Sequence, residues 1–353
     1  MAQYITSETR YFDQILSTTY DYYRATLVDN IFKMNALFYK MYKGGQIAYQ
    51  DGGASLIFPI MYGKNDTVAW YEDDEDIDVQ VQEGIGAAKM KWCQLAGSIS
   101  FTRKQRRMNS GRHQIINLIS AKLKQAEMSM HEKMNDAFYE AGAYNESQTS
   151  KQICGLEALV AETPDSYDVG GIDTSVQTFW QNKVRGNANT AFTWIDDSDA
   201  PSLATGPVAM RELYTWCSKG TGGPPNFGFA GIYGYLSYEA YMSTRQIYRD
   251  PEMAKMGFDN IKFRNMTLFY DEATKSENIT NAETQADHAL MFFLNTDFLH
   301  LKVDSQTDFV RTDFQRPVNQ DSEAALILWM GNMCTSKRSK HGVLADHNDT
   351  NVT

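Results

Sequence analysis

The stretch 110–141 constrains the fold more than any other part of the sequence, because its apolar residues keep helical spacing throughout. Steps of three and four residues place them on one face of an α-helix. This apolar stripe consists of Ile115, Ile119, Leu123, Ala126, Met130, Met134, Ala137 and Ala141. Asn109 or Ser110 can cap the start of the helix, and Gly142 can end it. At ~1.5 Å per residue the helix would measure roughly 45 to 50 Å, so we expect it to lie along a sheet or a neighbouring subunit.

The composition indicates a soluble, unexported protein with a substantial core. The chain has 353 residues, 42% of them hydrophobic, which suffices for one large domain or two ordinary ones. No apolar run reaches the ~18 residues of a membrane-spanning helix, and the N-terminus lacks the basic and apolar parts of a signal peptide. The net charge of -11 argues against a protein that mainly binds nucleic acid.

The segment before the long helix indicates an arm followed by two strands. Residues 6–43 carry a looser helical pattern, and strand-like runs follow at 54–61 and 87–104. Between the two runs lies an acidic block, consisting of Glu72, Asp73, Asp74, Glu75 and Asp76, with Asp78 and Glu83 close behind. Because an isolated two-stranded ribbon is marginally stable in water, these strands must rest on another surface.

A basic cluster complements the acidic block from the other end of the predicted ribbon. It consists of Arg103, Lys104, Arg106, Arg107 and Arg112. Since the two groups lie at opposite ends, their attraction is satisfied most naturally between neighbouring copies of the chain. Under this hypothesis, charge reversal at Asp73 and Asp74 should be rescued by charge reversal at Arg106 and Arg107. The alternative is that both groups are solvated faces.

A mixed α/β region follows the long helix. Gly206 and Pro207 predict the start of a helix that ends near Lys219. Strand-like runs lie at 227–232 and 261–270, with a short helix at 237–247 between them. The last part, 289–344, again shows strand-like alternation.

The sequence offers no recognisable catalytic, cofactor or metal site. His131 and Glu132 begin an HExxH-like pattern, but Asn135 stands where the second histidine is required. The acidic block resembles the start of a calcium loop, yet Val79 and Ile85 occupy positions that such a loop needs for glycine and glutamate. The four cysteines form no CxxC pair, which favours free buried thiols in a reducing compartment. We therefore expect a protein that is not an enzyme.

Several segments, in this order, resemble a recurrent series in the major capsid proteins of tailed bacteriophages. They are 169–173, 179–182, 292–296, 298–301, 317–321 and 325–331, leading to Arg338 and 342–344. Together with an arm, a ribbon with a charged tip and a long helix, the series resembles the Hong Kong 97-type capsid fold, which is of the α+β class. In that fold the ribbon is called the E-loop, the long helix is the spine of the P-domain, and the middle region is an α/β A-domain.

The resemblance implies a division of the chain. The N-terminal arm would span 1–44, the E-loop 45–108, the P-domain 109–149 and 291–353 with its spine helix at 110–141, and the A-domain 150–290. Some family members crosslink subunits through a lysine in the E-loop, and Lys64 lies near the ribbon tip. Its asparagine and glutamate partners are not identified in this sequence.

The resemblance also implies a function. The chain would assemble into hexamers and pentamers in the host bacterial cytoplasm, forming the icosahedral head around the double-stranded DNA of a tailed phage. Because the chain starts directly with the arm, we expect a separate scaffolding protein, besides portal and decoration proteins. Lys337, Arg338 and Lys340 are candidates for contact with packaged DNA. Two alternatives stay open: an encapsulating shell of a cellular compartment, and an α/β enzyme with an unrecognised site.

Overall fold

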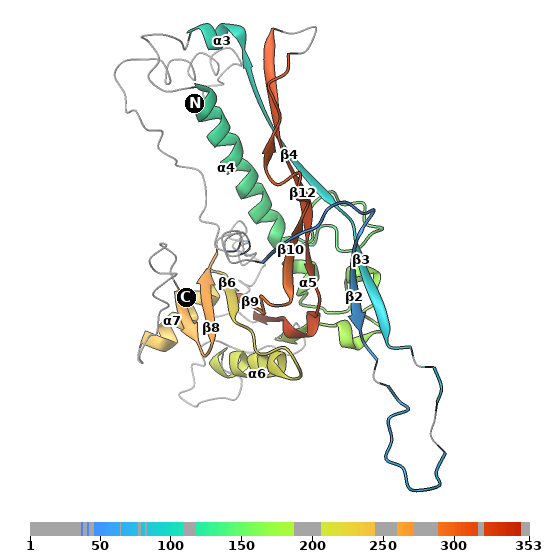
Figure 1. Cartoon of the computed structure of the whole chain (residues 1–353). Helices are drawn as coiled ribbons and strands as arrows, with labels where there is room; N and C mark the ends of the chain where they lie inside the picture. Colours follow the sequence, from blue (N-terminus) through green and yellow to red (C-terminus); the bar gives the residue numbers. More distant parts are fainter. Residues whose placement is uncertain are drawn as a thin grey trace.

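The structure, a computed structural model, describes residues 37, 41, 46–63, 65–76, 79–81, 83–108, 118–186, 206–243, 260–271, 289–316 and 321–346. These residues form two larger β-sheets, a separate two-stranded ribbon and a set of helices (Figure 1). The predicted arm at 1–44 lies outside the described residues, apart from Leu37 and Met41.

One sheet has five strands and is built around the long strand β12 (Ser322–Thr335). β4 (Cys93–Thr102) and β10 (Leu299–Val303) both pair antiparallel with it. β1 (Ile47–Tyr49) runs parallel to β10, and the short β11 (Val310–Arg311) pairs antiparallel with β12. Alternate residues of β10 are buried, the pattern of a sheet with one face against the core.

α4 (Leu118–Tyr139) packs against β4, and its described part confirms the predicted amphipathic helix (Figure 1). Met130, Met134 and Ala137 of the apolar stripe are buried, whereas Gln125 and Lys133 are exposed. The predicted first turns at 109–117, with both capping candidates, lie outside the described residues. Gly142, the predicted end signal, takes a φ of 57°, a left-handed conformation that favours glycine.

The other large sheet has six strands in the order β5-β13-β9-β6-β8-β7. Their bounds are β5 (Lys183–Arg185), β13 (Gly342–Asp346), β9 (Ala289–Leu294), β6 (Phe227–Ala230), β8 (Met266–Tyr270) and β7 (Asn260–Phe263). α6 (Gly206–Ser218) packs against β5 and β13, and α7 (Ile232–Ser243) packs against β8 and β9. α6 therefore confirms the helix predicted from Gly206.

Three predictions for this region need correction. β9 and β13 belong to the six-stranded sheet, although the sequence-based division assigned 291–353 to the P-domain sheet. Residues 290–294 of β9 are all buried, so this continuous apolar run lies in a sheet covered on both faces. The predicted strand 261–270 is a hairpin of β7 and β8, because the chain turns at Arg264, whose φ is 54°. α7 begins at Ile232 rather than at residue 237.

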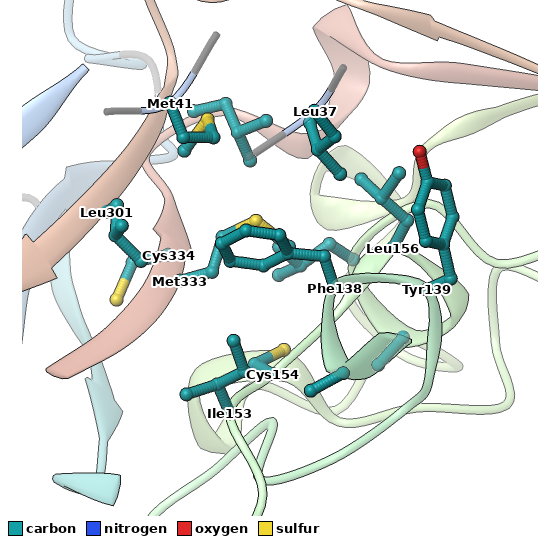
Figure 2. Close-up of a cluster of buried hydrophobic side chains, with 14 of the residues drawn as sticks. Leu37, Met41, Phe138, Tyr139, Ile153, Cys154, Leu156, Leu301, Met333 and Cys334 are labelled. Carbon is teal, nitrogen blue, oxygen red and sulfur yellow. The ribbon is translucent and has the colours of Figure 1, made fainter. Parts of the chain in front are cut away.

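The main hydrophobic core lies where the end of α4 meets the five-stranded sheet (Figure 2). The side chain of Phe138 occupies its centre, between Met333 of β12 and Leu156 of the short helix α5 (Leu156–Leu159). Leu37 and Met41, each 1% exposed, cover one side of this cluster. The described end of the predicted arm is therefore anchored in the core of its own chain.

All four cysteines are buried free thiols, which confirms the prediction. Burial raises the pKa of Cys93 to about 11 and that of Cys217 to about 12. The thiolate is the reactive form of cysteine, so these thiols are inert at neutral pH.

The connection between β12 and β13 buries two cations. It contains the short helix η4 (Arg338–Lys340), and both charged side chains are fully buried. The Lys340 ammonium donates to the carbonyl oxygens of Ser218, Lys219, Gly220 and Gly223, at 3.0–3.4 Å, just after the end of α6. Carbonyl groups at the end of a helix have no intrahelical partners and favour a positive charge, so Lys340 caps α6.

Arg338 performs the same task for α5. Its guanidinium donates to the carbonyl oxygens of Ala158 and Leu159 and to Oδ1 of Asn182. Burial lowers the pKa of Arg338 to about 10, so the side chain stays charged at neutral pH. Two further short helices, η2 (Val169–Gly171) and η3 (Thr178–Trp180), complete the connection from α4 to β5.

His341 lies next to these cations and is buried, so we expect the protein to lose stability in acid. Its Nδ1 accepts the Asn295 backbone N–H at 3.3 Å, and its Nε2 lies 3.0 Å from Oγ1 of Thr335. Since the Thr335 hydroxyl donates to the Phe298 carbonyl, Nε2 must carry the proton of a neutral ring. Burial, then the charge of Arg338, lowers the pKa of His341 to about 3.

The unfolded chain protonates this histidine near pH ~6.5. Its stabilising contribution is therefore present above that pH and is lost as the pH falls toward about 3. We expect His341→Gln to remove about 1 kcal/mol per pH unit from the pH dependence of unfolding between pH ~6 and ~4. Urea unfolding across this range measures the difference, and identical slopes for both proteins would contradict it.

Candidate assembly surfaces

The predicted ribbon is formed by β2 (Leu56–Met61) and β3 (Ile85–Met90), which pair antiparallel (Figure 1). Among the described strands of the predicted E-loop at 45–108, β2 and β3 stand apart from the large sheets, whereas β1 and β4 belong to the five-stranded sheet. The predicted single strand at 87–104 is interrupted at Lys91 and Trp92. Their side chains donate to the carbonyl oxygens of Gln148 and Gly53, which holds the break between β3 and β4 in place.

The base of the ribbon packs on its own chain. Phe58 and Ala88 are buried, and β3 contacts η2. Close to Ala88, a side chain at Gly170 would approach the Ala88 Cβ to 2.5 Å, so only glycine permits this contact. Tyr62 stacks on Phe179 at 5.4 Å between ring centroids. The ribbon therefore leaves the body in one fixed direction.

The ribbon loop, residues 62–84, contributes little to the core of its own chain. The large apolar side chains of its described residues are exposed, from 43% at Tyr62 to complete exposure at Trp70. The others are Val68, Tyr71, Val79 and Val81. The acidic block lies in the same loop, and all five of its residues are exposed. Exposed apolar groups gathered on one projection mark a surface that binds another molecule.

The basic cluster lies at the opposite end of the molecule. Most of it belongs to α3 (Arg103–Met108), at the far end of β4, whereas the ribbon loop projects from the other end (Figure 1). Arg103 and Lys104 are exposed. This placement confirms that the acidic block and α3 lie too far apart to meet within one chain. Lys64 and Arg112 lie outside the described residues.

Arg106 already has an acceptor within its own chain. Glu323, in the first part of β12, accepts from Arg106 at 2.9 Å and from Arg316 at 3.1 Å. This network fixes α3 to the five-stranded sheet. Glu323 could not be predicted as a partner of Arg106, because nothing in the sequence links two groups that lie 217 residues apart.

α3 itself was missed, although a local signal for it exists. The backbone N–H of Thr102 donates to the Gln105 side chain, and the Gln105 N–H donates to the Thr102 hydroxyl. This reciprocal pair is a capping box, in which threonine or serine is followed three residues later by glutamine or glutamate. The spacing is legible in the sequence and marks the change from strand to helix.

The prediction that Arg338 and Lys340 contact DNA is wrong. Both side chains are fully buried and bonded to backbone carbonyl oxygens of their own chain, so neither can reach a phosphate. Lys337 is partly exposed, but its ammonium donates to the carbonyl and hydroxyl oxygens of Thr221. Contact of Lys337 with DNA stays a proposal.

The described part of the chain was also searched for metal sites and for membrane-spanning helices, with the following result. Within it, no three His, Cys, Asp or Glu side chains are grouped so that they could hold a metal ion. None of its helices combines the length and the apolar character that a bilayer span requires.

Comparison with solved structures identifies the fold. The capsid subunit of cyanophage A-1(L) matches with a TM-score of 0.61, 12% sequence identity and coverage of 98% of this chain and 99% of that chain. The capsid of a native GTA particle matches with a TM-score of 0.59, 7% identity and coverage of 99% and 100%. The SrpI encapsulin of Synechococcus elongatus matches with a TM-score of 0.53, 11% identity and coverage of 93% and 95%.

Comparison of sequences, by contrast, finds no match to a family model or to a curated protein. At such low identities it is the spatial arrangement of the elements that connects the chain to these shells. The chain has the α+β, Hong Kong 97-type fold of phage major capsid proteins.

Proposed function

We propose that the protein is a major capsid protein, whose copies assemble as hexamers and pentamers into the icosahedral head of a tailed phage. The observation that carries this proposal is the match over nearly the whole chain to capsid subunits, with no additional domain among the described residues. The role of such a protein is structural, and no step of it requires catalysis.

The exposed surfaces support the proposal independently. A monomeric protein rarely exposes a row of large apolar side chains such as Trp70, Tyr71 and Val81. In a closed shell each ribbon loop can lie over the next subunit, where these side chains are buried. We further propose that the acidic block contacts the basic cluster of a neighbour, with Arg103 and Lys104 among its exposed cations.

The remaining partners follow from the same proposal. The shell would form in the host bacterial cytoplasm with a separate scaffolding protein, and it would contain a portal, carry decoration protein and enclose double-stranded DNA bound without sequence preference. A net charge of -11 suits a container, since a strongly basic wall would retain the genome. Uniform closed shells formed by the chain alone would contradict the need for a scaffolding protein.

Electron microscopy and sedimentation of the purified protein test the function. We expect capsomer rings or shells, in equilibrium with smaller species that prevail on dilution. A compact, protease-resistant monomer at every concentration, also after co-expression with the genes that flank it, would contradict a shell function and favour an α/β enzyme.

A second candidate function is favoured by one comparison. The encapsulin match indicates that the same fold also serves shells described as encapsulin complexes. The contents of particles formed in the natural host separate the two functions. Nuclease-resistant double-stranded DNA supports the phage head, whereas particles that enclose protein and lack DNA support the encapsulin-like shell.

A further inference from the structure

An apolar cavity lies beside the main core, between α4 and the five-stranded sheet. It has a volume of about 200 Å³. Most of the side chains that line it are apolar, and they include Leu95, Trp329, Met134, Ala137 and Ile153. Since a cavity of about 150 Å³ holds a benzene molecule, this one has room for an alkyl chain of about eight carbons.

The exposure of Leu95 shows that the cavity interrupts the core. Leu95 shares one face of β4 with Cys93 and Ile99, and each of these two is 3% exposed. Leu95 itself is only partly buried, because the cavity lies where other side chains would otherwise pack against it. Unfilled space beside an apolar side chain forfeits packing contacts. A ligand that fills the cavity would restore them.

The chain segment that forms one wall of the cavity is fixed by hydrogen bonds. The Gln152 carbonyl accepts from the Cys93 thiol at 3.2 Å and from the Ala143 N–H at 3.0 Å. The Cys154 N–H donates to Oδ1 of Asn332 at 2.7 Å. Because these polar groups are already paired, the cavity is preformed and its interior suits an apolar group.

Two cations, Lys133 of α4 and Lys151, line the same cavity. Both residues are exposed, so their ammonium groups lie where the cavity meets solvent. Neither forms an ion pair within the described part of the chain. The described residues that line the cavity include no aspartate or glutamate. The cavity therefore combines an apolar interior with a positively charged mouth.

We propose that this cavity binds a medium-chain fatty carboxylate, whose alkyl chain lies beside Leu95 and Trp329. Its carboxylate lies beside Lys133 and Lys151. Burial of the alkyl chain drives binding, and the two ammonium groups select a negative head group over a neutral or positive one. All of these residues belong to one copy of the chain, so the inference does not depend on the proposed shell function.

Three ligands with the same alkyl chain test the proposal without any change to the protein. Octanoate, octanol and octylamine are titrated into the full-length chain by calorimetry. We expect octylamine to bind at least about tenfold more weakly than octanoate, because its ammonium would lie beside two lysines, and octanol to fall between them. At about ten times its Kd, octanoate should raise the midpoint of thermal unfolding by about 2 °C. Equal affinities for octanoate and octylamine would overturn the inference.

Substitution of the two lysines tests the position of the head group. Lys133→Ala combined with Lys151→Ala should raise the Kd of octanoate about fivefold to thirtyfold. Lys124→Ala is the matched control and should leave the Kd unchanged, since Lys124 is an exposed lysine of α4 that does not line the cavity. A double variant that binds octanoate as tightly as the wild type would overturn the inference.

Octanoate that carries a bromine on its last carbon tests the position of the alkyl chain, because bromine quenches the fluorescence of a nearby tryptophan. Trp329 lines the cavity and is 1% exposed, so we expect saturable quenching that Trp329→Phe removes. Saturable quenching that persists in Trp329→Phe would place the ligand elsewhere and overturn the inference. Binding to the dissociated chain that is lost in assembled shells would also overturn it, because a neighbouring copy would then fill the cavity.

Discussion

We expect the chain to lose assembly but keep its fold when residues 63–83 are replaced by the dipeptide Asn-Gly. The flanking chain is already in place for a tight turn, because the strand register places Tyr62 opposite Gly84 and the Tyr62 N–H donates to the Gly84 carbonyl at 2.9 Å. Asn-Gly suits a two-residue turn between antiparallel strands. The replaced residues include Trp70, Val79 and Val81, which are almost fully exposed and therefore contribute nothing to the core of the monomer.

The effect on association should be large. Each apolar side chain that becomes buried between subunits contributes about 1.5 to 3 kcal/mol, so losing several should weaken each interface at least about a hundredfold. Sedimentation and electron microscopy measure assembly, and thermal unfolding measures the fold of the monomer. Shells that form as readily from the shortened chain as from the parent would contradict the role of the ribbon loop.

A single substitution on the ribbon loop distinguishes the contribution of its side chains to association from the contribution of its length. Trp70→Ala should reduce association, because Trp70 is the largest exposed apolar side chain of the loop. Val176→Ala is a matched control, since Val176 is 69% exposed and lies beside the body of the molecule, between η2 and η3. Equal losses from both variants would indicate a general effect of surface hydrophobicity.

Residues whose neighbours in space are also neighbours in the sequence could be predicted best. α4 and α6 could be predicted from the spacing of their apolar residues and from the signals at their ends. The pairing of strands in the six-stranded sheet does not change either helix. Pairing between distant strands is different, because a strand such as β9 carries no sign of which sheet accepts it. Its buried run Leu290, Met291, Phe292 and Phe293 fits either sheet on composition alone.

The burial of charged residues could not be predicted from the sequence either. Arg338 and Lys340 read as surface groups in the sequence, because isolated cations are rarely buried. The structure buries them against the ends of α5 and α6, where several carbonyl oxygens replace water. Glu323 and Arg106 likewise meet through folding alone. By contrast, the exposed acidic block could be predicted, since five consecutive acidic residues are almost always solvated unless a partner covers them.

The close approach of two chain segments after α4 depends on Gly142. Its φ of 57° is left-handed, and a side chain there would place Cβ 1.8 Å from the carbonyl oxygen of Ile153. The contact is held in register, because the Ala143 N–H donates to the Gln152 carbonyl at 3.0 Å. Gly171 offers a matched comparison, since its φ is 75° and no atom would lie within 4 Å of an added Cβ.

We expect Gly142→Ala to destabilise the monomer by about 3 kcal/mol or more, and Gly171→Ala by only about 1 kcal/mol. Both variants carry the cost of a left-handed alanine, but only Gly142→Ala must also push the 152–153 backbone away from the end of α4. That movement would disturb Cys154 and Phe138, which are fully buried in the core that supports the ribbon. Chemical unfolding of the dissociated protein measures both effects. If the two substitutions cost the same, the clash with Ile153 does not determine stability, and the end of α4 can shift without loss.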